Sequence, residues 1–390
     1  MQITDRAIEE KTIPLFRLAF RPLFLFGTAY AGWLMLRWIL TLTGVLTWTH
    51  PVALFTWHGH EMQFGFVMAI IIGFLCTAAQ NWTGIPGLRS WSLGIITACW
   101  LGGRIVANID PSSMALYVFD AAFIGLGATA VARQLVLSGN KRNLIFLPIL
   151  AVFLALHLGQ VWAMQSAPQY GQALGFAGIW WIALLVSLLA ARVVPFFIER
   201  RLNDKLPRDP VWWLAGAQFS LLALALLNVF SQPAIAMQLA ALIALVFQLP
   251  RLWRWYRVGI WAEPLLWSLY LSFAFLPVAL LMLAATGTDY LSMVMHLLGV
   301  GLIGGMIMAM MARVSLGHTG RMLNAHPLTV FAFAAMLLAA TARTLLPALG
   351  FEWTRFGYQL SAIGWMLSIG CFLWVYAPIL CKARADGNPG

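Results

Sequence analysis

The chain has 390 residues, of which 62% are hydrophobic and 9% are charged, and its formal net charge is +11. A soluble domain carries about 25% charged residues, so this chain lacks the polar groups to cover a globular surface and a soluble fold is excluded. Its basic residues are scattered over the connectors between apolar runs and form no continuous basic domain, which excludes a nucleic-acid-binding protein.

About twelve apolar runs follow one another along the chain. Each is about 20 residues long, the length with which an α-helix crosses a bilayer core of about 30 Å. Because helices satisfy their own backbone groups in lipid, we predict an all-α, polytopic membrane helix bundle. The predicted spans are 21–45, 55–80, 91–109, 113–137, 144–165, 171–197, 211–230, 233–250, 262–286, 289–312, 327–349 and 355–380.

The connectors predict the domain organisation and the orientation. The longest charged connector runs from Glu199 to Pro210. We therefore expect a single integral membrane domain over 1–390, with 1–200 and 211–390 as candidate halves, and we find no sequence repeat between these halves. Lys and Arg gather in every second connector and are nearly missing from the others. By the positive-inside rule, both termini should face the cytoplasm.

The segment Trp57 to Met62 carries two imidazoles, a carboxylate and a thioether at the start of the second predicted span. Ionisable groups in a membrane helix are costly without a partner, and ligation of a metal or haem would provide one. His58 shares a helix face with Glu61 and Met62, whereas His60 points to a nearly opposite face. One site cannot take both histidines unless the helix start is unwound, but two faces could serve a haem iron and a copper.

Histidines of three distant spans are expected at one depth. With the predicted orientation, His58, His60, His157 and His296 all fall in the periplasmic half of the bilayer. Together with Met62, they are our candidate metal ligands, and the four histidines are candidate cofactor ligands. A plain hydrogen bond to another helix is the alternative for His157 and His296, and a polar cap at a helix end is the alternative for His58 and His60.

Three arginines add a second set of candidates. Arg37, Arg104 and Arg343 lie inside apolar runs, again in the periplasmic half. A buried arginine needs an anion, and the carboxylates Glu61 and Asp120 are expected at a similar depth. Haem propionates would serve equally well, because a guanidinium binds a carboxylate through two parallel hydrogen bonds. For Arg104 and Asp120, a structural ion pair and an anion-binding role both remain open.

Several motifs of this chain resemble the NnrS family, and the resemblance covers nearly the whole sequence. They are Phe20-Arg21-Pro22, the WHGHEM segment 57–62, Asn81-Trp82-Thr83-Gly84 about twenty residues later, and the distant segment Arg313 to Arg321 with Leu316-Gly317-His318-Thr319-Gly320. The resemblance implies a protein of the bacterial inner membrane that binds haem and copper. It also implies a role in nitric oxide metabolism and in resistance to nitrosative stress, often beside denitrification genes.

The resemblance carries over His58, His60, Glu61, Met62, His318 and Arg321 as motif members. His318 is expected in the cytoplasmic connector after the tenth span, as a second ligand site or, with Arg313 and Arg321, as a site for an anion or a quinol headgroup. We expect the haem to be of the b type. Which histidine binds which metal stays open.

We derive three function hypotheses from these observations. The preferred one is a haem- and copper-containing oxidoreductase that reduces nitric oxide to N2O with electrons from a quinol, with Glu61 as the catalytic proton relay from the periplasm. The second is a protein that binds nitric oxide or copper without turnover. The third is a secondary transporter, which should have discontinuous helices at matching places in its two halves. The sequence shows no such pair.

Overall fold

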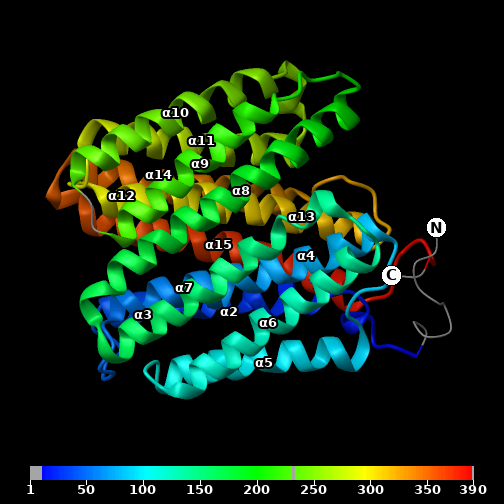
Figure 1. Ribbon diagram of the computed structural model, residues 1–390, viewed down its shortest axis with the longest axis horizontal. Helices are drawn as coiled ribbons and strands as arrows, with labels where there is room; N and C mark the ends of the chain where they lie inside the picture. Colours follow the sequence, from blue (N-terminus) through cyan, green and yellow to red (C-terminus); the bar gives the residue numbers. More distant parts are fainter. Residues whose placement is uncertain (1–10, 231–232, 389–390) are drawn as a thin grey trace. The chain divides into compact units, whose positions relative to one another are not determined.

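The computed structural model describes residues 11–230 and 233–388 (Figure 1). Within these residues every regular element is a helix and none is a strand. Twelve helical segments are long and apolar enough to cross a membrane. The predicted all-α membrane bundle with twelve spans is therefore confirmed, and the chain is a multi-pass membrane protein. The orientation of the termini stays a prediction.

The spans consist of the following helices, in chain order. They are α2 (Phe20–Leu42), then α3 (Leu54–His60), the π-helix η2 (Glu61–Val67) and α4 (Met68–Thr83), then α5 (Ser90–Ile109), α6 (Met114–Leu137), α7 (Phe146–Ser166), α8 (Gly171–Leu202), α9 (Val211–Val229), α10 (Ala234–Trp255), α11 (Pro264–Thr286), then α12 (Leu291–His296), the π-helix η6 (Leu297–Gly304) and α13 (Gly305–His318), then α14 (Pro327–Leu349) and α15 (Thr354–Cys381). Short 3-10 helices precede or join them: η1 (Pro14–Phe16), η3 (Lys141–Asn143), η4 (Pro168–Tyr170), η5 (Val258–Ala262) and η7 (Phe351–Trp353).

The chain forms two compact units. Within the described residues, the first unit consists of 11–175, Arg313–Leu323 and 372–388, and the second of 176–230, 233–312 and Asn324–Cys371. In the first unit, α2 and α6 both pack against α4, and α6 also packs against α5 and α7. In the second unit, α10 packs against α9 and α11, and η6 packs against α11 and α14. The first boundary between the units thus falls at Gly175, in the first turns of α8, and the charged connector lies inside the second unit.

The second span changes its helical form along its length. It runs as α-helix to His60, as π-helix from Glu61 to Val67, and as α-helix again to Thr83. In a π-helix the carbonyl of residue i accepts from the amide of residue i+5, and such turns are frequent at functional sites. The carbonyl of Gly65 also accepts a hydrogen bond of 2.8 Å from the Trp100 indole.

The same span is the central helix of the first unit. In its most apolar stretch, 83% of the residues are buried, whereas the corresponding fractions for α2, α5, α6 and α7 are 33–39%. Apolar surroundings weaken the competition of water for polar contacts, so the polar groups of this span must find partners on the neighbouring helices. These neighbours include α2, α5, α6, α7 and the first turns of α8.

Candidate functional site

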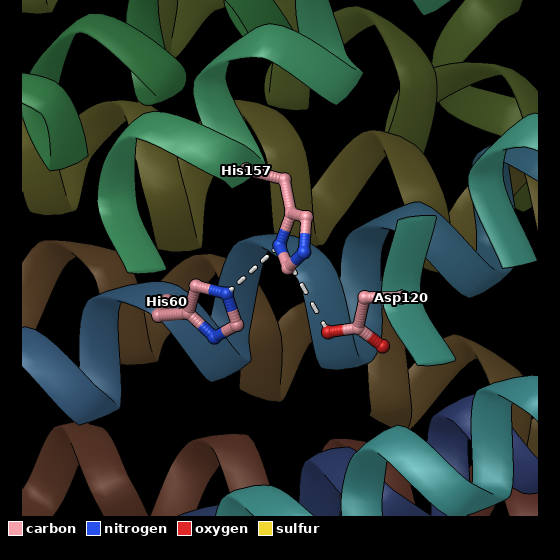
Figure 2. Close-up of side chains that lie close together, drawn as sticks. All are labelled: His60, Asp120 and His157. Atoms are coloured by element: carbon pink, nitrogen blue, oxygen red, sulfur yellow. Dashed lines mark hydrogen bonds and ion pairs between the residues drawn. The ribbon is translucent and has the colours of Figure 1, made fainter. Parts of the chain in front are cut away.

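Two histidines and an aspartate from three helices lie together in the first unit (Figure 2). His60 ends α3, Asp120 lies on α6 and His157 on α7, and their side chains are at most 1% exposed. Nε2 of His60 lies 3.2 Å from Nδ1 of His157, and Nδ1 of His157 lies 4.0 Å from Oδ2 of Asp120. One potential metal-ligating atom of each residue lies within 4.8 Å of the other two.

Glu61 determines which nitrogen of His60 carries the proton. Oε1 of Glu61 lies 2.8 Å from Nδ1 of His60, and an ionised carboxylate can only accept hydrogen bonds. Nδ1 of His60 must therefore donate, so in the neutral ring Nε2 presents a lone pair to His157. A metal-binding histidine usually donates its other ring N–H to a carboxylate, which fixes the ring and makes it a stronger ligand. Glu61 and His60 have this arrangement.

Arg104 on α5 joins the two carboxylates. Its Nη1 donates to Oε2 of Glu61 at 2.5 Å, and its Nη2 forms a short ion pair with Oδ2 of Asp120. Arg104 is 4% exposed and Glu61 is fully buried, so water screens neither pair. For Arg104 the sequence left a structural pair and an anion site open, and the structure shows it paired with both carboxylates. Glu61 lies enclosed between these partners.

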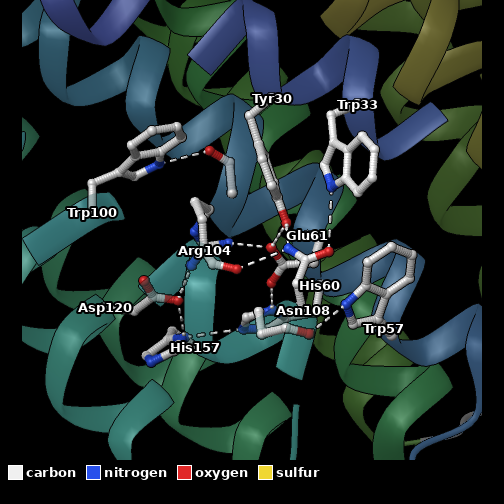
Figure 3. A network of polar contacts seen from close by, with 12 residues as sticks. Tyr30, Trp33, Trp57, His60, Glu61, Trp100, Arg104, Asn108, Asp120 and His157 are labelled. Atoms are coloured by element: carbon white, nitrogen blue, oxygen red, sulfur yellow. Dashed lines mark hydrogen bonds and ion pairs between the residues drawn. The ribbon is translucent and has the colours of Figure 1, made fainter. Parts of the chain in front are cut away.

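Two further polar residues complete the network, and the sequence analysis did not single them out (Figure 3). The hydroxyl of Tyr30 donates to Oε2 of Glu61 at 2.5 Å, and Nδ2 of Asn108 donates to the Tyr30 hydroxyl at 3.0 Å. Nδ2 of Asn108 also donates to the carbonyl of Arg104 at 2.8 Å. The sequence signals were a lone tyrosine in the apolar first span and an asparagine near the end of the third, and neither indicates a partner.

The charges of the ion-paired core of this network, formed by Glu61, Asp120 and Arg104, do not cancel, and Arg37 reaches this core only through Asn108. Two carboxylates and one guanidinium leave one negative charge when both imidazoles are neutral. Within the described residues, Oδ1 of Asp120 and Nε2 of His157 have no hydrogen-bond partner, although both atoms are buried. A buried charge without compensation is strongly unfavourable. The cluster therefore favours a bound cation, either a proton on one of its groups or a metal ion.

The other candidates of the first unit lie outside this cluster. The ring of His58 stacks on Trp38 with 4.0 Å between centroids, as expected from its two-residue offset from His60. Met62 lies in the π-helix and is half-buried. The backbone carbonyl of His318, which ends α13, accepts a hydrogen bond of 3.2 Å from Arg384, and its ring lies 5.6 Å from that of Phe20.

Arg37 connects the network with the connector after α2. It forms a short hydrogen bond with Oδ1 of Asn108, and its Nη2 lies 3.2 Å from Nε2 of His50. Burial, and then the charge of Arg37, lower the pKa of His50 below its ordinary value, so a neutral His50 accepts this bond. Arg37 also lies over the Trp57 ring, 4.9 Å from its centroid. No carboxylate pairs with Arg37 within the described residues.

The remaining candidates, His296 and Arg343, belong to the second unit. Nδ1 of His296 donates to the carbonyl of Ser292 at 2.7 Å, which leaves Nε2 as the ring's lone-pair nitrogen. The guanidinium of Arg343 lies 3.6 Å from the centroid of the Tyr358 ring. The structure thus brings His60, His157, Glu61 and Arg104 together, and it places the other candidate residues in other surroundings.

Replacing Gly65 with alanine should disturb the site directly. A Cβ at this position would lie 2.6 Å from Nη1 of Arg104, 2.7 Å from a ring carbon of Tyr30 and 3.0 Å from Oε2 of Glu61. We expect the free energy of unfolding to fall by about 1–3 kcal/mol, as for other overpacked sites. The measurement is the unfolding temperature in detergent, which should be lower than that of the wild type. Gly59→Ala is the matched control, because its Cβ would meet nothing within 4 Å and should cost no stability. Equal unfolding temperatures for the two variants would contradict the packing described here.

A comparison with known proteins places nearly the whole chain in one family. The model of one protein family, described as NnrS protein, matches residues 14–384. No curated protein matches the chain. The matched range contains all twelve spans and every residue of the buried cluster. The chain belongs to the NnrS family.

Proposed function

We propose that this chain is a bacterial inner-membrane protein of nitric oxide metabolism that holds copper on His60, His157 and Asp120. The single observation that carries the proposal is the buried cluster with its excess negative charge. Membership of the NnrS family supports the role in nitric oxide metabolism.

The donor atoms of the cluster suit copper. Imidazole nitrogens with a carboxylate oxygen are a common ligand set for first-row transition metals. Two nitrogens about 2.0–2.1 Å from one tetrahedral ion lie about 3.3 Å apart, and the facing nitrogens of His60 and His157 are 3.2 Å apart. A monovalent copper ion would also cancel the excess negative charge. When bound, copper supplies one-electron redox chemistry and a position for a small ligand.

The surrounding residues prepare this site. Glu61 holds His60 in the tautomer whose Nε2 faces His157, and Arg104 fixes the positions of Glu61 and Asp120. Phe64 packs against both imidazoles, at 5.1 Å from His60 and 5.2 Å from His157 between ring centroids, and excludes water from them. Nitric oxide is small and apolar, so it can reach such an enclosed site through the lipid and between the helices.

Haem does not fit between His60 and His157 as they are placed. Their ring centroids are 5.4 Å apart, and their facing nitrogens approach each other directly with no room for a porphyrin. The other histidines proposed as haem ligands, His58, His296 and His318, lie outside this cluster. Haem of the b type therefore rests on the resemblance alone, and we derive no step through it.

We further propose that the protein reduces nitric oxide. Two molecules of nitric oxide, two electrons and two protons give one N2O and one water, with a quinol as the electron donor. Glu61, which contacts His60, Tyr30 and Arg104, is the group that we propose to pass protons toward the site.

The proposal is tested with purified, copper-loaded protein, a quinol and dissolved nitric oxide. We expect nitric oxide to disappear from the electrode trace while half as much N2O is formed. His157→Ala should abolish both signals, and His326→Asn, at an exposed helix start, should keep them. Copper-loaded wild type that consumes no nitric oxide even with a strong reductant would end the enzymatic proposal. Spectroscopic binding of nitric oxide without N2O would instead favour a binding protein without turnover.

One observation favours transport as a second candidate function. Irregular helices at matching places are typical of secondary transporters, and the π-helices η2 and η6 are such a pair. Both spans nevertheless remain continuous helices across the change of form. Purified protein without copper or nitric oxide reactivity, but with ion-dependent uptake into proteoliposomes, would make transport the better explanation.

A further inference from the structure

The spans that contain the two π-helices share a sequence pattern. Both have His, then Gly five positions later, and Thr-Gly eighteen positions after that Gly: His60, Gly65 and Thr83-Gly84 in one, and His296, Gly301 and Thr319-Gly320 in the other. Every member of the second set lies 236 positions after its counterpart. In both spans the π-helix begins at the residue after the histidine.

The local structure at the two span ends agrees as well. Gly84 and Gly320 both have a φ of 69°, the left-handed conformation that ends a helix. The hydroxyl of the preceding threonine donates to the carbonyl four residues earlier, at 2.7 Å for Thr83 and 2.6 Å for Thr319. These two spans are also the two most buried, with 83% and 72% of their most apolar stretches enclosed.

The neighbouring helices extend the correspondence. In the span before each span with a π-helix, an aromatic ring lies close to the glycine: Tyr30 of α2 lies beside Gly65, and Phe275 of α11 lies beside Gly301. The helix after each of the two spans carries an arginine near its end, Arg104 or Arg343. The following helix begins with a tyrosine in its first turns, Tyr117 or Tyr358, and a buried polar residue three positions later, Asp120 or Ser361.

We infer that spans one to four and nine to twelve are two copies of one four-helix unit. The repeat is not visible between the halves on either side of Glu199 to Pro210, because the copies are not halves: four spans separate them. Most matched positions are also apolar, and apolar residues recur in any membrane helix by composition alone.

The second copy has an arginine that corresponds to Arg104, but it has no carboxylate that corresponds to Glu61 or Asp120. Leu297 stands where the first copy has Glu61, and Ser361 where it has Asp120. Arg343 remains, and no carboxylate of the described residues lies within ion-pair distance of it. Its Nη1 is buried and has no hydrogen-bond partner among those residues. Arginines near helix ends often extend to the water, but this guanidinium lies 3.6 Å from the centroid of the Tyr358 ring.

We propose that the second copy is a binding site for a planar oxyanion, with Arg343 as its counterion. A half-buried guanidinium in a membrane-spanning helix is costly without a counterion, and an anion with two coplanar oxygens can take two parallel hydrogen bonds from it. A small free anion such as formate or nitrite has this chemistry, and so does the carboxylate of a larger membrane-soluble cofactor. The proposal does not depend on copper or nitric oxide, because it rests on the second unit alone.

Equilibrium dialysis of the purified protein against labelled formate tests the proposal. Wild type should bind one formate per chain, and formate should raise its unfolding temperature. Arg343→Gln should weaken binding by at least about tenfold, the loss of one charge-assisted contact, and should abolish the thermal shift. Arg355→Gln is the control, because Arg355 is exposed on the following helix, and it should behave as wild type. Arg343→Lys keeps the charge, so it should bind formate more weakly but measurably, even if the glutamine variant fails to fold.

A second arm distinguishes the sources of the anion. If a cofactor carboxylate already fills the site, wild type should take up no formate, and mass spectrometry of the denatured protein should reveal a carboxylate compound that Arg343→Gln lacks. The proposal is overturned if wild type shows neither formate binding nor such a compound. It is equally overturned if Arg343→Gln and wild type bind formate alike.

Discussion

Replacing Arg104 with methionine is expected to destabilise the protein by about 3–5 kcal/mol, the usual cost of removing one partner from a buried ion pair. Arg104 is 4% exposed and contacts both Glu61 and Asp120, which are at most 1% exposed. Its loss leaves two buried carboxylates without their common cation. Methionine has a similar length and flexibility, so little of the effect should come from lost packing. The measurement is thermal unfolding in detergent, followed by tryptophan fluorescence.

The second copy of the four-helix unit provides the matched control for this variant. Arg343 occupies the corresponding helix and has no carboxylate partner among the described residues. In anion-free buffer, Arg343→Met should therefore leave the unfolding temperature unchanged or raise it, because it removes a charge and leaves no other charge without its partner. The unfolding temperature of Arg104→Lys should lie between those of wild type and Arg104→Met. An ammonium keeps the charge but cannot bond both carboxylates with the fork geometry of a guanidinium. If Arg104→Met unfolds at the wild-type temperature, the carboxylates are not held by this ion pair.

The sequence was sufficient for the architecture because membrane insertion imposes a simple rule. Each span needs about 20 apolar residues, and this rule recovered all twelve spans found in the described residues. The boundaries differ where the chain leaves the bilayer: the eighth span was predicted to end at 250, but α10 continues to Trp255 and includes Arg251. Arg251 is fully buried against Ser187 and Gln248, a set of partners that apolar length alone does not reveal.

For the site, the sequence indicated the depth of each group but not its neighbours. The shared depth of His60 and His157 was deduced from span order, and the structure places their nitrogens 3.2 Å apart. His58 was expected on the opposite face from His60, and it stacks on Trp38. Tyr30 and Asn108 were missed because uniformly apolar helices carry little periodicity to show which face meets which helix. The π-helices were missed for the same reason.

Copper analysis of ligand variants is expected to show the other large effect. Wild type purified after loading with monovalent copper should hold one copper on the cluster of His60, His157 and Asp120. His60→Ala and His157→Ala each remove a nitrogen ligand and should weaken binding by more than about 100-fold, beyond the 10- to 100-fold typical of outer-shell changes. Glu61→Gln should weaken copper binding by only about 10- to 100-fold, because glutamine can still accept a hydrogen bond from Nδ1 of His60 but carries no charge. Mass spectrometry of bound metal measures the stoichiometry.

A control variant and a spectrum of the bound copper test whether these residues are the ligands. His326→Asn changes an exposed histidine but keeps an acceptor for the amide of Leu328 at the start of α14, so it should retain all copper. Oxidation to divalent copper should give an electron paramagnetic resonance signal with hyperfine coupling to two imidazole nitrogens in wild type. Asp120→Asn should keep both nitrogens while it shifts the signal, because only the oxygen ligand changes. Full copper content in both His60→Ala and His157→Ala would mean that the excess negative charge of the cluster is neutralised by a proton, and that the metal lies elsewhere.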